Sequence, residues 1–373
     1  MNLTPVTLFD RAAGQLGDLC RVAGFPEDGA PVDVLRELLC AAGPRPLSEP
    51  PLWPSDVADD ATPVEFSLAF DDSGNRAVRI LGETLPEQPS PTANIDAARR
   101  FLTRMAQRLD LTLDRFHAVE DLFLTDDPQG KFALWFSVIL RPGRAPALKV
   151  YFNPLVRGVS AAPELVAEAL RRLGLGEAYD TVTEYALRRG PADRFSFFAL
   201  DLDDGPLSRV KLYISHDRAV SDDVEHAARA VDGVDPLRLR EFLDLTGGGP
   251  GPYAGRPLVS SYSFVEEDAG RPGNYSLYLP IRDYVPDDAV ARERTRAHLA
   301  RAGVDPAGLD RAVRAVTDRC LADGTGLIAH LSLRLGRFGS GTTVYLSSEA
   351  YAVAPPRARI TTSGQRGAAT AAV

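Results

Sequence analysis

Residues 147–154 read ALKVYFNP, and this stretch decides how the fold is interpreted. Three apolar residues alternate with Lys149 and Tyr151, which is the period of two that is typical of a β-strand. An ammonium and a phenol therefore share one face of the strand, while the other face is apolar. The stretch RVKLYI at residues 209–214 repeats this arrangement with Lys211 and Tyr213.

Strand-like runs occur in five pairs, and turn-forming residues join the two members of each pair. The pairs are VEFSLAFDD with RAVRILGETL, FALWFSVILR with ALKVYFNP, RFSFFALDL with SRVKLYISH, LVSSYSFVEE with NYSLYLPIRDY, and GLIAHLSLRLG with TTVYLSSEAYA. Between the pairs the apolar period changes to about 3.6, which predicts amphipathic helices. One such helix is NIDAARRFLTRMAQRL at residues 94–109, with Asn94 as its predicted N-cap.

Four tyrosines mark corresponding positions in successive repeats. Tyr151, Tyr213, Tyr278 and Tyr345 are separated by 62, 65 and 67 residues. A nearly constant spacing indicates one supersecondary unit that is repeated along the chain. The unit is a helix followed by two antiparallel strands.

Ten antiparallel strands would leave two long edges in an open sheet, and closure into a barrel removes those edges. The apolar strand faces must meet the apolar helix faces, so the polar faces point into the lumen. The predicted fold class is α+β: a ten-stranded antiparallel β-barrel surrounded by helices, in five αββ(α) repeats. We predict an N-terminal helical segment and linker at residues 1–60, one barrel domain at 61–355, and a disordered tail at 356–373.

The predicted lumen combines basic and phenolic side chains. Its members are Arg79, Lys149, Tyr151, Arg209, Lys211, Tyr213, Tyr278, Arg334 and Tyr345. Buried cations are costly without a partner, so we expect an anionic ligand, and several Arg and Lys together suit a diphosphate. Each tyrosine ring would stabilise a nearby cation by roughly 0.5–2 kcal/mol. This combination predicts a site that ionises an allylic diphosphate and shields the carbocation.

Glu65 in PVEFSLAF is the only carboxylate among the apolar residues of its strand. It is suited to accept a hydrogen bond from an N–H group of an aromatic co-substrate. A structural carboxylate paired with a lumen arginine remains an alternative for Glu65, and a surface strand position remains one for Arg334. Trp135 in ALWFSV is interpreted as a core residue, with a wall of the substrate site as the alternative.

Composition and spacing exclude several other classes of protein. The net charge is −9, and no concentrated basic patch favours a nucleic-acid partner. The three cysteines are far apart, and the five histidines show no metal-binding spacing. The N-terminus does not resemble a secretory signal, and no run of eighteen apolar residues indicates a membrane span. We therefore expect a cytoplasmic protein that is a monomer or homodimer.

A magnesium-dependent diphosphate site needs clustered aspartates such as DDxxD, because Mg²⁺ is held through carboxylate oxygens. The nearest cluster is Asp56, Asp59 and Asp60 in the apparent linker. Asp71-Asp72 and Asp203-Asp204 fall in predicted turns, where Asp is a common turn residue. We expect the basic lumen to replace the charge of a metal, with no cofactor and no requirement for Mg²⁺.

The strand blocks resemble those of the aromatic prenyltransferases of the αββα-barrel (ABBA, or PT-barrel) type. The similarity is to the dimethylallyltryptophan synthase family and its bacterial indole prenyltransferases, and it spans roughly residues 10–355. The matching blocks are PVEFSLAF, VRILGETL, LKVYFNP, RVKLYI, YSLYLPIRDYV and VYLSSEAY. This resemblance implies a transferase of secondary metabolism, including alkaloid biosynthesis.

The resemblance also implies the role of each site residue. The basic residues, with Arg334 matching less securely because Arg337 is close, would hold the diphosphate of dimethylallyl diphosphate. The four tyrosines would form the cage of the cation. Glu65 would accept the indole N–H of L-tryptophan. The chain departs from fungal members at Ser276, which stands where they often have Gln, and in FALWFSVIL, which lacks their proposed lysine base.

Three functions are consistent with this pattern. The first is prenylation of free L-tryptophan, at C5, C6 or C7 rather than at C4. The second is the same chemistry on a larger indole, such as a cyclic dipeptide or an indolactam, or on a phenol. The third is a non-catalytic barrel that binds diphosphates or lipids, and Glu65 and the tyrosines argue against it because a pure anion binder does not need them.

Overall fold

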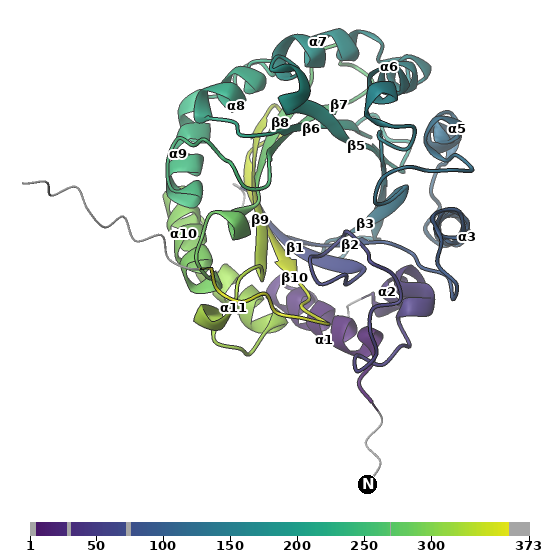
Figure 1. Ribbon diagram of the computed structural model, residues 1–373, viewed down its shortest axis with the longest axis vertical. Helices are drawn as coiled ribbons and strands as arrows, with labels where there is room; N and C mark the ends of the chain where they lie inside the picture. Colours follow the sequence, from purple (N-terminus) through teal and green to yellow (C-terminus); the bar gives the residue numbers. More distant parts are fainter. Residues whose placement is uncertain (1–4, 28–30, 72–75, 269, 358–373) are drawn as a thin grey trace, which may run out of the picture.

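The computed structural model describes residues 5–27, 31–71, 76–268 and 270–357. Ten antiparallel strands form a closed barrel in the order β1-β10-β9-β8-β7-β6-β5-β4-β3-β2, and helices surround it (Figure 1). The strands are β1 (Val64–Asp71), β2 (Arg76–Gly82), β3 (Leu134–Leu140), β4 (Ala147–Phe152), β5 (Asp193–Asp201), β6 (Val210–His216), β7 (Leu258–Phe264), β8 (Asn274–Leu279), β9 (Ile328–Gly336) and β10 (Gly341–Ser347). The predicted fold class is confirmed.

Helices precede each strand pair, and most strand pairs are preceded by two α-helices rather than by one. The α-helices are α1 (Leu8–Val22), α2 (Val32–Leu39), α3 (Pro91–Leu109), α4 (Asp114–His117), α5 (Glu120–Phe123), α6 (Ala162–Arg172), α7 (Glu177–Ala186), α8 (Ser221–Ala228), α9 (Pro236–Gly247), α10 (Asp288–Arg301) and α11 (Ala307–Val316). Their apolar faces and the outer faces of the strands form one hydrophobic layer around the barrel. No helix of the described ranges is long and apolar enough to cross a membrane.

Strand β4 shows how the sequence separates the two sides of the barrel wall. Phe152 is fully buried, and its ring lies 5.5 Å from Phe116 and 4.7 Å from Phe123, centroid to centroid, beneath the helices. Tyr151 pairs in register with Trp135 of β3, so both side chains point to the opposite side, which is the lumen. The predicted assignment of the two faces is therefore confirmed for this strand.

The N-terminal helix α1 packs against α11 and α2 and lies between them in the ring of helices (Figure 1). The buried Gln15 amide donates to the carbonyl oxygens of Val316 (2.9 Å) and Ser348 (3.0 Å), and Ser348 donates back to Gln15 (2.6 Å). These bonds connect the first helix to the end of the last strand pair. The division into residues 1–60 and 61–355 stays a prediction.

The predicted N-cap of the helix after the first strand pair is wrong. Helix α3 begins at Pro91, and its N-cap is Ser90, whose hydroxyl accepts from the Ala93 N–H at 3.1 Å, whereas Asn94 is buried inside the helix. The Pro at the first helical position needs no N–H partner, which allows the earlier start.

The structure describes the first two residues of the predicted tail, 356 and 357, and the tail as a whole stays a prediction. Arg357 donates its backbone N–H to the Pro286 carbonyl at 2.8 Å, and its guanidinium forms a 2.6 Å ion pair with Asp283. The remaining tail, residues 358–373, lies outside the described residues, as does the predicted turn at residues 72–75.

The alternation in β4 predicts opposite consequences for two adjacent substitutions. Phe152→Ala removes a ring from the layer beneath the helices and should destabilise the fold by about 3–5 kcal/mol. Tyr151→Phe keeps the ring in the lumen and should leave the free energy of unfolding within about 1 kcal/mol of wild type. Urea unfolding of both variants measures the difference. Equal destabilisation would contradict the assignment of the faces.

Candidate active site

The basic side chains meet at one end of the lumen, which we call the basic end (Arg79, Lys149, Arg209, Lys211 and Arg334). Lys149 Nζ lies 2.6 Å from Asp201 Oδ1, and Arg209 Nε lies 2.6 Å from Asp201 Oδ2. Arg79 donates to the Thr343 hydroxyl at 3.2 Å across β1. The structure therefore brings together five predicted residues from β2, β4, β9, β6 and the turn before β6.

Asp201 is a site residue that the sequence analysis missed. It stands directly opposite Lys149 in the β4–β5 register. Burial opposes its ionisation, but the charges of Lys149 and Arg209 outweigh that effect and hold the pKa of the carboxyl well below its usual value. The signal was its place in RFSFFALDL, on the same strand face as Phe197 and Ala199.

Lys211 is the least compensated cation of the basic end. Its side chain is almost fully buried, and its ammonium makes no hydrogen bond or ion pair with any described residue. The ammonium lies 5.1 Å from the centroid of the Tyr213 ring. Burial, followed by the charges of Lys149 and Arg209, lowers the pKa of Lys211 well below its usual value. A bound anion would relieve both effects.

The ambiguity between Arg334 and Arg337 is resolved by their environments. Arg334 faces Ser276 and Gly341 in register, and its Nε is buried without a hydrogen-bond partner. Arg337 lies beyond the end of β9, half exposed, and pairs with Asp268 at 2.8 Å. Arg334 is therefore the arginine that faces the lumen.

The four predicted tyrosines form a continuous belt around the inner wall, which we call the tyrosine belt (Tyr151, Tyr213, Tyr278 and Tyr345). Successive ring centroids are 5.9, 5.7 and 6.0 Å apart. Along β10, Tyr345 lies between Thr343, which contacts the basic end, and Ser347, which stands opposite Glu65. The belt therefore separates the basic end from Glu65.

Trp135 extends this aromatic lining, so its interpretation as a core residue is wrong. Its ring lies 5.8 Å from Phe197 and stacks on Phe132 at 3.9 Å, centroid to centroid. Phe197 in turn contacts Tyr213 at 5.6 Å. Trp135 is buried because aromatic side chains of the lumen cover it, not because it faces the helices.

Glu65 lies at the opposite end of the lumen from the basic residues. It is only 4 % exposed, and its Oε1 has no hydrogen-bond partner. Burial raises the pKa of Glu65 to about 7, while the nearby Arg282 opposes this rise and Asp59 adds to it. An unsatisfied buried acceptor is suited to bind an N–H group.

The aspartates of the linker are engaged in other contacts. Asp59 Oδ1 forms ion pairs with Arg256 (3.0 Å) and Arg282 (3.3 Å), and Asp60 accepts from the Tyr351 N–H at 2.9 Å. Asp56 pairs with Lys131 at 2.6 Å. These contacts fasten the linker to the barrel. Among the described residues, no three His, Cys, Asp or Glu side chains are grouped so that they could hold a metal ion.

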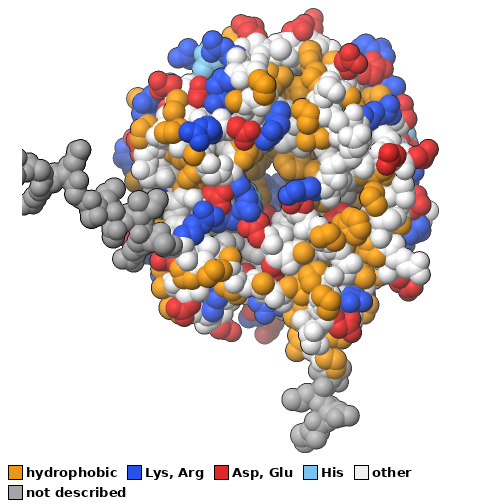
Figure 2. All heavy atoms as spheres, viewed as in Figure 1, with side chains coloured by type: hydrophobic (Ala, Val, Ile, Leu, Met, Phe, Trp, Pro, Cys, Tyr) orange, Lys and Arg blue, Asp and Glu red, His pale blue; other side chains and the backbone are white. Residues whose placement is uncertain are grey.

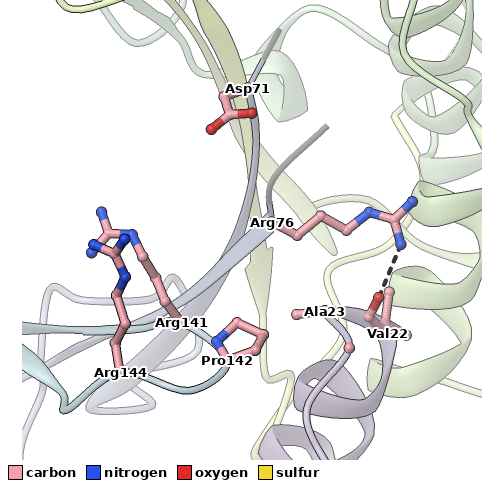
Figure 3. Close-up of a pocket in the computed structure, with 8 residues that line it drawn as sticks. Val22, Ala23, Asp71, Arg76, Arg141, Pro142 and Arg144 are labelled. Carbon is pink, nitrogen blue, oxygen red and sulfur yellow. Dashed lines mark hydrogen bonds between the residues drawn. The ribbon is translucent and has the colours of Figure 1, made fainter. Parts of the chain in front are cut away.

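A cavity of about 580 Å³ opens beside the strand ends that carry the basic residues. Arg141 and Arg144 extend side by side from the β3–β4 turn, Asp71 lies across the opening, and Arg76 points away to the Val22 carbonyl at 3.1 Å (Figure 3). Burial and the charges of Arg79 and Arg209 lower the pKa of Arg141. The cavity is therefore within the field of the basic end and suits the approach of an anion.

Viewed along the barrel, the molecular surface is hollowed near its centre, and Lys and Arg side chains border the hollow (Figure 2). A closed αββ barrel with basic residues at one end of its lumen, a tyrosine belt and a buried carboxylate defines the class of αββα-barrel prenyltransferases. The sequence profile of the tryptophan dimethylallyltransferase family matches residues 32–310. The chain belongs to this family of prenyl-transferring enzymes.

Solved structures of bacterial enzymes are similar over nearly the whole chain. The 6-dimethylallyltryptophan synthase of Micromonospora olivasterospora, in complex with DMASPP and Trp, is 53 % identical, with a TM-score of 0.91 over 94 % of this chain and 100 % of that one. The 5-dimethylallyl tryptophan synthase of Streptomyces coelicolor is 37 % identical, with a TM-score of 0.88 over 96 % of this chain and 100 % of that one.

Two further relatives extend the comparison. The prenyltransferase PriB, in a ternary complex with L-tryptophan and dimethylallyl thiolodiphosphate, is 41 % identical, with a TM-score of 0.88 over 95 % of this chain and 99 % of that one. Deoxybrevianamide E synthase of Aspergillus versicolor is 27 % identical over 212 residues. The match covers 49 % of this chain and 46 % of the fungal enzyme, which is about half the length of that enzyme.

Substitution of Asp201 tests the charge balance of the basic end. Asp201→Asn removes the partner of Lys149 and Arg209, and breaking a buried ion pair costs about 3–5 kcal/mol. We expect a lower melting temperature that inorganic diphosphate restores more strongly than it stabilises wild type. Asp203→Asn, in the exposed turn two residues later, is the control. Equal melting temperatures for the two variants without diphosphate would contradict the role of Asp201.

Substitution of Glu65 should increase stability and reduce activity. The folded pKa of about 7 exceeds the ordinary value of 4.5, so between these pH values the folded state keeps a proton that the unfolded state has lost. The stability that Glu65 contributes is thus present below pH 4.5 and is lost as the pH rises through 7. Glu65→Gln, which does not titrate, should melt above wild type at pH 8 and level with it at pH 4.5.

Turnover of the same variant should fall about 100-fold if Glu65 binds the N–H group of the acceptor. The control is Glu266→Gln, in the exposed turn after β7. A variant that melts like wild type at pH 8 would show that the carboxyl is not disfavoured by burial. Unchanged turnover would remove the assignment of Glu65 to the acceptor.

Proposed function

We propose that the protein transfers the dimethylallyl group of dimethylallyl diphosphate to the benzenoid ring of L-tryptophan, at C6. The observation that carries this proposal is the Lys211 ammonium. It is buried in the basic end without an ion-pair partner among the described residues, and it lies next to the tyrosine belt. An anion bound there completes the charge balance. The identity of 53 % with a 6-dimethylallyltryptophan synthase, against 37 % with a 5-dimethylallyl tryptophan synthase, supports C6.

In the proposed reaction, the basic end binds the diphosphate and stabilises the negative charge that develops on it. The allylic C–O bond breaks, and the bonding electron pair leaves with the diphosphate. The tyrosine belt surrounds the resulting cation, whose charge the ring faces stabilise and from which they exclude water. The depth of the belt, between Thr343 and Ser347 along β10, matches a cation that forms between the two substrates.

Glu65 is proposed to hold the indole. Its carboxylate would accept the indole N–H and increase the electron density of the ring. The ring carbon then attacks the allyl cation, forming the new C–C bond and an arenium ion. Because Glu65 and the basic end lie on opposite sides of the belt, each substrate approaches the cation position from its own side.

We also propose that the reaction needs no Mg²⁺. Lys149, Arg209 and Lys211 supply positive charge where diphosphate-binding enzymes with aspartate clusters place metal ions. The nearest aspartates, Asp56 and Asp59, are instead held in ion pairs with basic side chains. A cytoplasmic location is part of the same proposal.

The test is incubation of the full chain with dimethylallyl diphosphate and L-tryptophan in excess EDTA. We expect a product heavier by one prenyl unit, with NMR placing the substituent at C6. Lys211→Met should raise the KM for dimethylallyl diphosphate at least about 10-fold, since it removes a charge-assisted contact, without lowering the melting temperature.

Each other outcome has a defined meaning. Activity lost in EDTA and restored by Mg²⁺ would refute metal independence alone. A product formed only with a cyclic dipeptide, an indolactam or a phenol would favour the larger or different acceptor. No product with any of these acceptors, together with tight binding of diphosphate, would favour a non-catalytic barrel.

The control for Lys211→Met is Arg271→Gln, which changes an exposed surface arginine.

A further inference from the structure

The proposed reaction leaves one step without a residue. After the C–C bond forms, C6 of the arenium ion carries both the prenyl group and a hydrogen. A base must remove that proton, and the electron pair of the C–H bond then restores the aromatic ring. The base must face the lumen on the acceptor side of the tyrosine belt and must be unprotonated.

Most lumen groups do not meet these conditions. Burial raises the pKa values of Tyr151 and Tyr345, so their hydroxyls keep their protons. Lys149 is held by Asp201 at the basic end, where the diphosphate binds. Glu65 is engaged with the indole N–H in the proposed complex.

His330 meets both conditions. It lies on β9 directly opposite Tyr345 in the β9–β10 register, and the two ring centroids are 6.1 Å apart in an edge-to-face arrangement. Ser332 and Arg334, two and four residues further along β9, are also on the lumen face. Because β9 runs antiparallel to β10, His330 stands at the end of β9 away from Arg334, which is the side of Glu65.

The backbone next to His330 is adapted to its position. The β9–β10 register shifts between Tyr345 and Leu346, which leaves Ala329 as an extra residue beside the histidine. Such bulges turn the adjacent side chain and occur frequently next to active sites. The buried carboxylate of Asp288 holds the start of β9 by accepting the Leu327 and Ile328 N–H groups, each at 3.2 Å.

The imidazole is open to the lumen and free to accept a proton. His330 is partly exposed although its strand is closed on both edges, and neither ring nitrogen makes a hydrogen bond with any described residue. Burial within the barrel, followed by the charges of Arg282 and Arg256, lowers its pKa well below the usual value. The ring is therefore neutral at neutral pH.

We propose that His330 is the catalytic base that takes the C6 proton from the arenium ion. A ring nitrogen forms the new N–H bond, the C6–H electron pair returns to the indole ring, and the imidazolium later gives the proton to water. This assignment rests on the proposed function. The proximity of Arg282 and Arg256 disfavours the imidazolium, which promotes release of the proton before the next turnover.

The test uses His330→Ala, His330→Phe and His330→Asn with L-tryptophan deuterated at C6. Wild type should show no isotope effect on product formation, since proton removal follows a slower step. In all three variants, turnover should fall about 100-fold or more and a primary isotope effect above about 2 should appear. Added imidazole should restore part of the rate in His330→Ala. Binding of inorganic diphosphate should stay within about 2-fold of wild type.

Several results would overturn the assignment. A His330→Phe variant as active as wild type would make the ring an aromatic wall only. Slow variants without an isotope effect would mean that His330 supports the fold or the substrate position. His117→Gln, at an exposed position outside the barrel, is the matched control. If wild type itself gave no prenylated tryptophan, the proposed function would fail, whereas full activity of all three variants would refute the role of His330 alone.

Discussion

The candidate active site depends on the burial of several cations inside a closed barrel. Lys149 and Arg209 share the carboxylate of Asp201, while Lys211 has no counter-charge among the described residues. Burying such a charge opposes folding, so the hydrophobic layer between strands and helices must offset it. The buried side chains hold their positive charges in fixed positions before the anionic substrate binds. The site therefore needs little rearrangement of these charges when the diphosphate leaves.

Closure of the sheet makes this arrangement possible. In an open sheet, the polar face would be wet and its charges would be screened. In the barrel, the same face becomes an enclosed lumen, where the electrostatic interaction with a diphosphate is stronger. The tyrosine belt follows from the same geometry, because residues at equivalent positions of successive repeats lie at one level of the wall.

The two ends of the lumen differ in charge, just as the inner and outer faces of the barrel wall differ in polarity. The cations that would hold the diphosphate gather at one end, and Glu65 is buried at the other, near Arg282 and Asp59. The two ends fit substrates of opposite chemistry: one binds an anion and the other accepts an N–H group. The distance between them is spanned by aromatic rings, which stabilise a cation but offer it no strong nucleophile.

The sequence by itself determined the strands, their two faces and the level of the tyrosines, because the period of two assigns each side chain to a face without knowledge of its partners. It therefore predicted Glu65 and the basic and tyrosine residues of the lumen. Only the tertiary structure decided which residues meet. Asp201 meets Lys149 through the β4–β5 register, across the connection that holds α6 and α7. Trp135 and His330 stand opposite Tyr151 and Tyr345 in the hairpins β3–β4 and β9–β10. The register between paired strands decides these contacts, because a slip of one residue would turn each side chain to the other face.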